Sequence, residues 1–399
     1  MIPLHEAQDF VLSKCVPNPI ATIPIDDAAD LVLAGELSAV GPIPPFDNTA
    51  MDGFAVRAAD VENAPVTLDM VGTIAAGAAP DITVGEGQAV RIMTGAPMPP
   101  GADAVVMVEL TTMSEDETSV DIAEAVPVGN HIRPAGDDVT AGQVVFEPGT
   151  HLRPAHLGVC TSIGVYEVPV FSRPKVGVIS TGDELVDGPR PLEIGEIHDS
   201  NRHTLLALVA AMGATAVDLG LVPDDEEQIR SAMTAAAESC DAVVTSGGVS
   251  MGDFDYVKKV LTEIGDMRWM QVAIKPAKPL AFGTVNGTPI FGLPGNPVSS
   301  MVSFELFARP GLRKMMGHDE PLVAPVRGMA GADMTRRSDG KTHFARVHAT
   351  MRDDGRYEAS FSGGQGSHQL SAMAAANAFA IVPDGDGIAE GEPVDLILL

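Results

Sequence analysis

The arrangement of apolar runs between residues 175 and 316 constrains the fold of this 399-residue chain more than any other feature. Residues 175–180 (KVGVIS) are almost continuously apolar, which is typical of a strand buried on both faces. Residues 203–213 have the pattern of a helix that ends at a glycine, and residues 214–222 form a second strand-like run. Strands and helices that alternate at this length predict a parallel sheet with helices on both faces.

The same alternation continues toward residue 316. Further helices and strands are predicted at residues 225–239, 241–248, 254–265, 267–274, 279–293 and 298–316. The dipeptide Asn286-Gly287 favours a two-residue hairpin turn in the middle of one of these runs. Asp224 and Glu227 have the spacing of a capping box, which predicts the start of a helix at this position.

The N-terminal part of the chain has a different pattern. Apolar residues recur at helical spacing around residues 4–11 and again around 28–33, so the first forty residues are expected to be helical. A further helix is predicted at residues 151–162.

Two regions are predicted to be rich in β-strands. Residues 66–109 contain short strand-like runs divided by glycine and proline, and the acidic segment 111–126 is expected to form an exposed hairpin beside them. After residue 321 short strands return, which predicts a small C-terminal β-barrel.

The composition argues against several classes of protein. With 54 acidic and 25 basic residues the net charge is −29, whereas nucleic-acid and anionic-membrane surfaces need clustered cations. An anionic substrate must therefore be bound by a local site. Three cysteines are too few for a disulfide framework. The N-terminus lacks a secretory pattern, and the longest weakly polar run has about 14 residues against roughly 20 for a membrane span. We expect a cytoplasmic protein without membrane or nucleic-acid contacts.

Three loops follow predicted strands of the α/β region: residues 180–184 (STGDE), 245–255 (TSGGVSMGDFD) and 292–297 (GLPGNP). In open α/β sheets, ligands bind beyond the carboxyl ends of the strands. Glycine pairs at these ends let backbone N–H groups approach a phosphate. The alternative is that the loops are tight turns without a ligand.

Two of the eight lysines in the chain, Lys275 and Lys278, lie three residues apart in IKPAKP. The prolines beside them stiffen the segment and prevent a continuous helix. Cations held rigidly at a strand end of an acidic protein suit an oxyanion. A solvated surface pair is the alternative.

Several carboxylates gather near the same strand ends, namely Asp183, Glu184, Asp224, Asp253 and Asp255. Carboxylates beside a phosphate loop are expected where a divalent cation bridges protein and phosphate oxygens. Helix capping is the alternative, and it is strongest for Asp224.

The first half of the chain contains two further polar loops. One is FDNTAMDGFAVR, with Asp52, and the other is RIMTGAPMPPGADAVV, with Thr94. Their density of Asp, Thr and Gly beside rigid prolines is compatible with either turn formation or ligand binding.

Six segments of the chain, taken in order, closely resemble the motifs of molybdopterin molybdenumtransferases, the MoeA and gephyrin E-domain family. They are DNTAMDGFAV, RIMTGAPMPPGADAVV, STGDEL, SGGVSMGDFDY, IKPAKP and FGLPGNPVSS. The resemblance extends over essentially the whole chain, including FARVHA and SGGQGSHQLSAMAAANAFAIVP near the C-terminus. One departure is Ala277, where many relatives have glycine.

The resemblance implies a multidomain α/β plus β fold. It implies a doubly wound α/β pterin-binding domain at 171–318 and a C-terminal β-barrel domain at 319–399. An elongated helical linker domain would comprise residues 1–45 and 140–170, and an inserted β-rich domain would comprise residues 46–139. Family members act as homodimers, whose active sites are completed by loops of the partner's inserted domain.

The reaction implied by the resemblance is insertion of molybdate into adenylylated molybdopterin, with release of AMP and with Mg²⁺ as cofactor. The phosphate would be cradled by Gly247, Gly248, Ser250 and Gly252, with Ser246 beside them. Lys275 and Lys278, with Pro294 and Pro297 nearby, would form the molybdate pocket. Asp183, Glu184, Asp224 and Asp255 would bind Mg²⁺ or position the pyrophosphate, with Glu184, Asp224 and Asp255 as the metal ligands. Asp52 and Thr94 would come from the partner subunit, and Arg346 and Ser367 from the C-terminal module.

Two other functions remain possible at this point. The first is a molybdopterin adenylyltransferase, because such enzymes have a similar glycine loop. The additional domains of this chain disfavour that activity. A separate adenylyltransferase is also a possible partner of this chain. A binding scaffold is the second, because the gephyrin E domain also holds receptor peptides. The acidic and lysine loops argue against a purely structural role.

Overall fold

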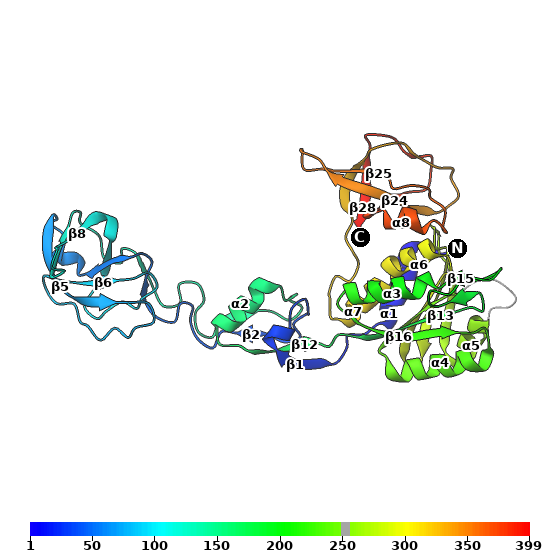
Figure 1. Ribbon diagram of the computed structural model, residues 1–399, viewed down its shortest axis with the longest axis horizontal. Helices are drawn as coiled ribbons and strands as arrows, with labels where there is room; N and C mark the ends of the chain where they lie inside the picture. The colour runs from blue at the N-terminus through cyan, green and yellow to red at the C-terminus, as the bar shows by residue number, and fades with distance from the viewer. Residues whose placement is uncertain (249–255) are drawn as a thin grey trace. The chain divides into compact units, whose positions relative to one another are not determined.

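The computed structural model describes residues 1–248 and 256–399, and the chain divides into two units (Figure 1). The large unit comprises residues 1–21, 30–34 and 169–399, and the small unit comprises residues 22–29 and 35–168. Within the described ranges, no helix is both long and apolar enough to span a membrane.

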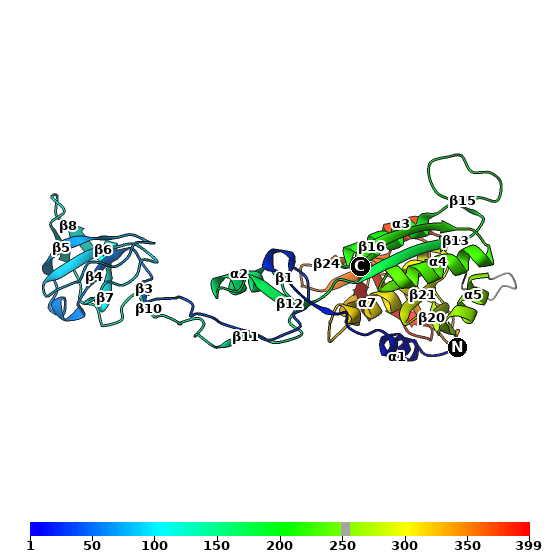
Figure 2. The same cartoon turned by 90° about the horizontal axis from the view of Figure 1, so that it is seen from below.

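A six-stranded mixed sheet forms the centre of the large unit (Figure 2). Its strands are, in order, β16 (Thr215–Val222), β13 (Lys175–Thr181), β17 (Ala242–Ser246), β21 (Thr288–Leu293), β20 (Pro279–Val285) and β18 (Asp266–Gln271). The first four strands are parallel, and β20 and β18 are antiparallel to their neighbours. The predicted hairpin turn is confirmed, since Asn286 and Gly287 both have positive φ, at 51° and 86°.

Helices cover both faces of this sheet, as predicted for a doubly wound α/β fold. They are α1 (Leu4–Lys14), α3 (Ser200–Ala211), α4 (Glu226–Ser239), α5 (Tyr256–Ile264), α6 (Pro297–Ser303) and α7 (Arg309–Met315), with a π-helical segment Phe304–Ala308 between the last two. Neighbouring strand residues face opposite sides. Val244 and Phe291 pack with α1, α3, α6 and α7, whereas Val243 and Ile290 pack with α4 and α5.

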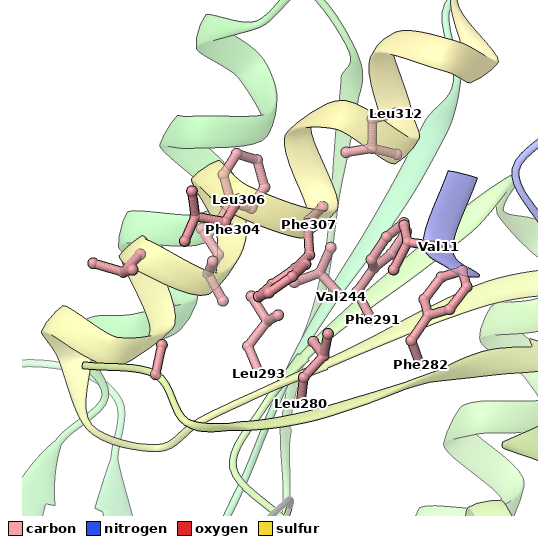
Figure 3. Close-up of a cluster of buried hydrophobic side chains, with 14 of the residues drawn as sticks. Val11, Val244, Leu280, Phe282, Phe291, Leu293, Phe304, Leu306, Phe307 and Leu312 are labelled. Atoms are coloured by element: carbon pink, nitrogen blue, oxygen red, sulfur yellow. The ribbon is translucent and has the colours of Figure 1, made fainter. Parts of the chain in front are cut away.

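The N-terminal helix α1 completes one of these faces. Figure 3 shows Val11 beside the phenylalanines of β20 and β21, on the side of the sheet covered by the π-helical segment and α7. The rings of Phe282 and Phe291 lie 4.9 Å apart, and Phe10 meets Phe282 edge-on at 5.8 Å. Residues 4–14 therefore belong to the hydrophobic core beside the α/β sheet. The boundaries of the four domains that were predicted from the sequence remain a prediction.

The C-terminal part of the large unit is a closed five-stranded barrel, as predicted. Its strands are β24 (Thr342–Met351), β25 (Tyr357–Phe361), β22 (Val326–Ala330), β28 (Pro393–Leu398) and β26 (Ala378–Val382), and β26 pairs back with β24. The interior is filled largely by small side chains such as Ala345, Ala359 and Ala380. The barrel also pairs with the α/β domain, because the two-residue strand β19 (Ile274–Lys275) lies parallel to β24. Helix α8 (Leu370–Ala374) follows β25.

The small unit contains a second six-stranded sheet. Its order is β7 (Ala104–Met107), β4 (Gly53–Val56), β6 (Gln88–Ile92), β5 (Val66–Ile74), β9 (Ser119–Ile122) and β8 (Thr111–Met113). The antiparallel pair β8–β9 is the predicted acidic hairpin. Helix α2 (Pro154–Ser162) confirms the helix predicted at 151–162. The remaining short strands of the two units together are β1 (Ile20–Pro24), β2 (Leu37–Ser38), β3 (Asn48–Thr49), β10 (Ile132–Arg133), β11 (Val144–Phe146), β12 (Glu167–Phe171), β14 (Leu185–Val186), β15 (Ile197–His198), β23 (Met334–Thr335) and β27 (Gly387–Ile388).

Two local predictions were wrong. Residues 28–33 are not helical, because Asp30 has a positive φ of 61° and the next three residues, 31–33, are all buried. Three consecutive buried residues do not fit one face of a helix. The cap of α4 is Asp225, which accepts a hydrogen bond from the Gln228 N–H at 2.9 Å, so the capping position lies one residue after Asp224. Asp224 is therefore free for another role.

Candidate active site

The three predicted loops leave the sheet at neighbouring positions. Strands β13, β17 and β21 are adjacent and parallel, and Ser246 is in register with both Ser180 and Leu293. The loops that follow these strands therefore begin at one edge of the sheet, where α/β proteins bind ligands. This is the arrangement that the sequence predicted.

Two of these loops lie in direct backbone contact. The Gly247 N–H donates to the Leu293 carbonyl at 3.1 Å, and a Cβ on Gly295 would lie 3.9 Å from the Gly247 Cα. Gly247 has φ +95°, and a Cβ there would lie 2.9 Å from the Thr181 carbonyl oxygen. Gly248 has φ +66°, and its Cβ would meet the Val257 side chain at 2.3 Å. Only glycine fits at these positions, because the start of this loop packs tightly against the end of β13 and against α5.

Asn201, in the first turn of α3, holds the same two loops together. Its Nδ2 donates to the Ser246 hydroxyl at 2.7 Å and to the Gly295 carbonyl at 2.8 Å. Asn201 was not among the candidates predicted from the sequence. The only available signal was its place two residues after Asp199, which caps the helix by accepting from the Arg202 N–H at 3.1 Å.

An ionic cluster around the buried Arg202 anchors this turn of α3, with Asp199 buried and Asp187 and Asp218 half exposed. The guanidinium of Arg202 donates to Asp199, Asp187 and Asp218, and Asp199 also accepts from the Ser180 hydroxyl at 2.9 Å. Burial lowers the pKa of Arg202, but the hydrogen bonds to Asp218 and Asp199 outweigh it and keep the pKa above its usual value. Arg202 thus remains a cation that fixes the start of the helix.

The predicted carboxylates at the end of β13 and β16 lie close together. The Asp224 N–H donates to the Asp183 carboxylate at 3.0 Å. Burial raises the pKa of Asp224, and the negative charges of Asp183 and Glu184 raise it further. Among the described residues, no group of three His, Cys, Asp or Glu side chains is arranged to hold a metal ion. The third predicted ligand, Asp255, lies outside the described residues, as do Ser250 and Gly252.

Lys275 and Lys278 are both exposed and lie where the α/β domain meets the barrel. Lys275 is in register with His343 of β24, and the Lys278 carbonyl accepts from the Val272 N–H at 2.7 Å. Lys275 also lines a cavity of about 400 Å³, together with Arg337, His343 and other residues of the barrel. Burial lowers the pKa of His343, and the nearby positive charges of Arg336 and Lys275 act in the same direction.

Arg346 of β24 is completely buried. One terminal nitrogen donates to the Gly364 carbonyl at 2.6 Å, whereas Nε and the other terminal nitrogen have no partner in the described part of the chain. Burial lowers the pKa of this guanidinium. A buried cation with free donors is unusual, because unpaired buried polar groups are costly, and it suits an anionic ligand.

The remaining candidates of the large unit lie around the start of α6. Pro294 is buried just after β21, and Pro297 is the first residue of the helix, where its missing N–H costs nothing. The Val298 N–H donates to the Ser367 carbonyl at 3.2 Å. A loop of the barrel is therefore joined to the third glycine-rich loop.

In the small unit, Asp52 and Thr94 form a direct contact. The Thr94 N–H and hydroxyl both donate to one Asp52 carboxylate oxygen, at 2.7 and 3.0 Å. These bonds, the backbone one first, hold the pKa of Asp52 below its usual value. The pair is exposed. Every other described candidate belongs to the large unit.

Comparison with known proteins matches nearly the whole chain. Residues 2–164 match the "MoeA N-terminal region (domain I and II)", residues 177–314 the "Probable molybdopterin binding domain", and residues 330–399 the "MoeA C-terminal region (domain IV)". A molybdopterin molybdenumtransferase of Haemophilus influenzae is 37% identical over 399 residues, which cover 99% of this chain and 98% of that protein. The chain belongs to the molybdopterin molybdenumtransferase family.

Other relatives agree with this membership. A molybdopterin molybdenumtransferase 2 of Mycobacterium tuberculosis is 40% identical over 373 residues, 91% of each chain. The crystal structure of the molybdopterin biosynthesis MoeA protein from Pyrococcus horikoshii matches with a TM-score of 0.85 at 30% identity, covering 100% of both chains. The family and fold predicted from the motifs are confirmed. This member of the molybdopterin molybdenumtransferase family is a transferase of molybdenum cofactor biosynthesis.

Proposed function

We propose that this transferase inserts molybdate into adenylylated molybdopterin and releases AMP. The observation that carries the proposal is the combination of a backbone cradle at residues 246–248, in which positions 247 and 248 accept only glycine, with the buried cation Arg346 of the same unit, two of whose donors have no partner among the described residues. In a chain with a net charge of −29, unpaired cations are expected only where an anion binds. A phosphate on the cradle and molybdate at the cations account for both features.

The molybdopterin phosphate would bind at the ends of β17 and β21. Gly247 and Gly248 bring backbone close to the ligand, and the Ser246 hydroxyl lies at the same strand end. Such backbone-lined sites bind phosphate through N–H groups and need no clustered cations. This explains how an acidic protein binds a phosphorylated pterin.

Molybdate would bind as substrate near Lys275, Lys278 and Arg346. The two unpaired nitrogens of Arg346 are buried donors, and guanidinium groups bind oxyanions through paired N–H groups. Lys275 adds a flexible charge at the junction with the barrel. Pro294, Pro297 and Ser367 would shape the neighbouring wall.

We further propose Mg²⁺ as the cofactor, held by Glu184 and Asp224 with Asp255, and with Asp183 beside them. The donor set fits, because Mg²⁺ prefers carboxylate oxygens and because Asp183 and Glu184 raise the pKa of Asp224 by their negative charge. When bound, the ion supplies positive charge that offsets the carboxylates and the phosphate oxygens.

The protein would act as a cytoplasmic homodimer in which Asp52 and Thr94 serve the partner's site. Support comes from the ordered geometry of this exposed pair, in which two hydrogen bonds from Thr94 fix the Asp52 carboxylate. A molybdopterin adenylyltransferase would supply the adenylylated substrate, and we expect neither nucleic acid nor membrane among the partners.

Product analysis tests the proposed reaction. Purified protein is incubated with adenylylated molybdopterin and Mg²⁺, with and without molybdate, and AMP is measured by chromatography. We expect AMP release that requires molybdate. Consumption of ATP with unadenylylated molybdopterin would instead indicate an adenylyltransferase. The absence of both reactions, with retained binding of a protein partner, would indicate a scaffold.

A further inference from the structure

The amide of Asn201 can have only one orientation. A carbonyl oxygen accepts hydrogen bonds and cannot donate them, so the Asn201 atom at 2.8 Å from the Gly295 carbonyl must be the nitrogen. The same nitrogen lies 2.7 Å from the Ser246 hydroxyl oxygen. Both hydrogens of the amide are therefore used, one for each loop, and Ser246 accepts rather than donates in this contact.

This orientation determines what Ser246 offers to a ligand. A serine hydroxyl has a single hydrogen, and that hydrogen is not used in the bond from Asn201. The Ser246 side chain lies at the carboxyl end of β17, beside the glycine cradle. Its hydrogen is consequently available to be donated to a ligand oxygen, and a hydrogen bond donated to a charged oxygen is stronger than one between neutral groups.

Asn201 is itself held in place. Asp199 caps the helix and binds Arg202, whose guanidinium is surrounded by three carboxylates. Asn201, which lies between Asp199 and Arg202 in the first turn, therefore has little freedom to move. An amide at this point can keep two loops from distant parts of the sequence at a constant spacing.

We propose that Asn201 is a positioning residue for phosphate recognition: it joins the loops after β17 and β21 and makes the Ser246 hydroxyl an obligate donor. The inference rests on the proposed function, in which this edge of the sheet binds the molybdopterin phosphate. Asn201 acts through Ser246 and Gly295 and does not itself touch the substrate.

A double-mutant cycle tests this role, with adenylylated molybdopterin as the probe and its Kd measured without molybdate. We expect Asn201→Ala and Ser246→Ala each to weaken binding about tenfold, the typical effect of losing one hydrogen bond to a charged group. The double variant should bind within about twofold of Ser246→Ala, because the two residues act on one interaction. Additive losses, near hundredfold, would overturn the proposal.

The second test replaces the hydrogen-bond donor of Asn201 by an acceptor. In Asn201→Asp the carboxylate keeps the shape but can only accept, so it would take the Ser246 hydrogen away from the ligand. Binding should weaken more than in Asn201→Ala, while the molybdate concentration for half-maximal AMP release stays within about twofold of native. If Asn201→Asp bound adenylylated molybdopterin with the native Kd, the proposed action of Asn201 through Ser246 would be overturned.

Controls separate the possible failures. Melting temperature and circular dichroism establish that each variant is folded, and Ser246→Ala reports on the site even if Asn201→Asp unfolds. If the native protein does not bind adenylylated molybdopterin, the proposed function fails. If the native protein binds and Ser246→Ala has no effect, the donor role of Ser246 fails while the proposed function stands.

Discussion

Thr94 donates two hydrogen bonds to a single carboxylate oxygen of Asp52, although the two residues lie 42 positions apart in the sequence. The second carboxylate oxygen receives neither of these bonds. An exposed pair with this geometry has a carboxylate that stays ionised and points in a set direction. Both features suit a group that contacts a cation or a hydrogen-bond donor of another molecule.

The first prediction concerns the charge of Asp52. Thr94→Val removes the hydroxyl bond and keeps the backbone bond, so the pKa of Asp52 should rise part of the way toward its ordinary value. Carboxyl NMR titration measures this. Because the folded-state pKa is depressed, the small stabilisation is present above the ordinary pKa and is lost as the pH falls through the folded-state pKa. Thr67→Val, which removes an exposed Thr–Asp bond elsewhere in the small unit, should leave both Asp52 and AMP release unchanged.

The second prediction tests sharing of sites between subunits. Asp52→Ala and Asp224→Asn should each inactivate the homodimer, yet subunit exchange between them should restore about a quarter of the native activity. Half of the dimers are then hybrids with one intact site of two. Exchange is verified by differently tagged subunits. Verified exchange without recovered activity would contradict a shared site.

The third prediction concerns molybdate. Lys275→Ala should raise the molybdate concentration needed for half-maximal AMP release at least about tenfold, since it removes a charge-assisted contact. Binding of adenylylated molybdopterin should change little. The matched control is Lys14→Ala, which removes the same charge from a surface pair with Asp266. Equal loss of both ligands in Lys275→Ala would assign this lysine to the phosphate site.

The fourth prediction concerns Mg²⁺ and pH. The raised pKa of Asp224 means that its ionisation opposes folding, a penalty absent below the ordinary pKa and complete above the folded-state pKa. Asp224→Asn should therefore raise the melting temperature at neutral pH without Mg²⁺, and it should abolish Mg²⁺-dependent AMP release. Asp225→Asn, which preserves the cap of α4, should do neither. Native AMP release in Asp224→Asn would exclude this carboxylate as a metal ligand.

The fifth prediction compares two buried arginines. Arg346→Met removes a cation with two unpaired donors and should keep or raise the melting temperature, while molybdate-dependent AMP release is lost. Arg202→Met leaves three carboxylates without their cation and should destabilise the protein by about 3–5 kcal/mol in denaturant unfolding. Equal destabilisation by both substitutions would mean that Arg346 is a structural residue.

Periodicity and turn chemistry predicted most of the fold, because these signals are local. Buried strands such as residues 175–180, the hairpin at Asn286-Gly287 and the strand-end loops at 180–184 and 292–297 appear where the sequence placed them. The errors at residues 28–33 and at Asp224 have a common origin. In both, the spacing fitted a helical pattern, and a neighbouring residue, Asp30 or Asp225, determined the backbone.

Contacts between distant segments were beyond a reading of the sequence. Asn201 is an ordinary residue for the first turn of a helix, and its two acceptors lie 45 and 94 positions away. The unpaired nitrogens of Arg346 could not be predicted from the sequence either, because whether a buried cation has partners depends on how the barrel closes. The motifs predict candidate residues, and tertiary packing decides which hydrogen bonds each of them can donate.

The two-residue strand β19 places Lys275 in the hydrogen-bonding ladder of the barrel, whereas the glycine cradle belongs to the α/β sheet. The proposed molybdate lysine is thus supported by the barrel as well as by the α/β domain, whereas the proposed phosphate cradle is supported by the α/β sheet. A change in the barrel that shifts β24 would therefore act on Lys275 more directly than on Gly247 and Gly248. Preference among tetrahedral oxyanions can therefore diverge between relatives during evolution while recognition of the pterin phosphate is preserved.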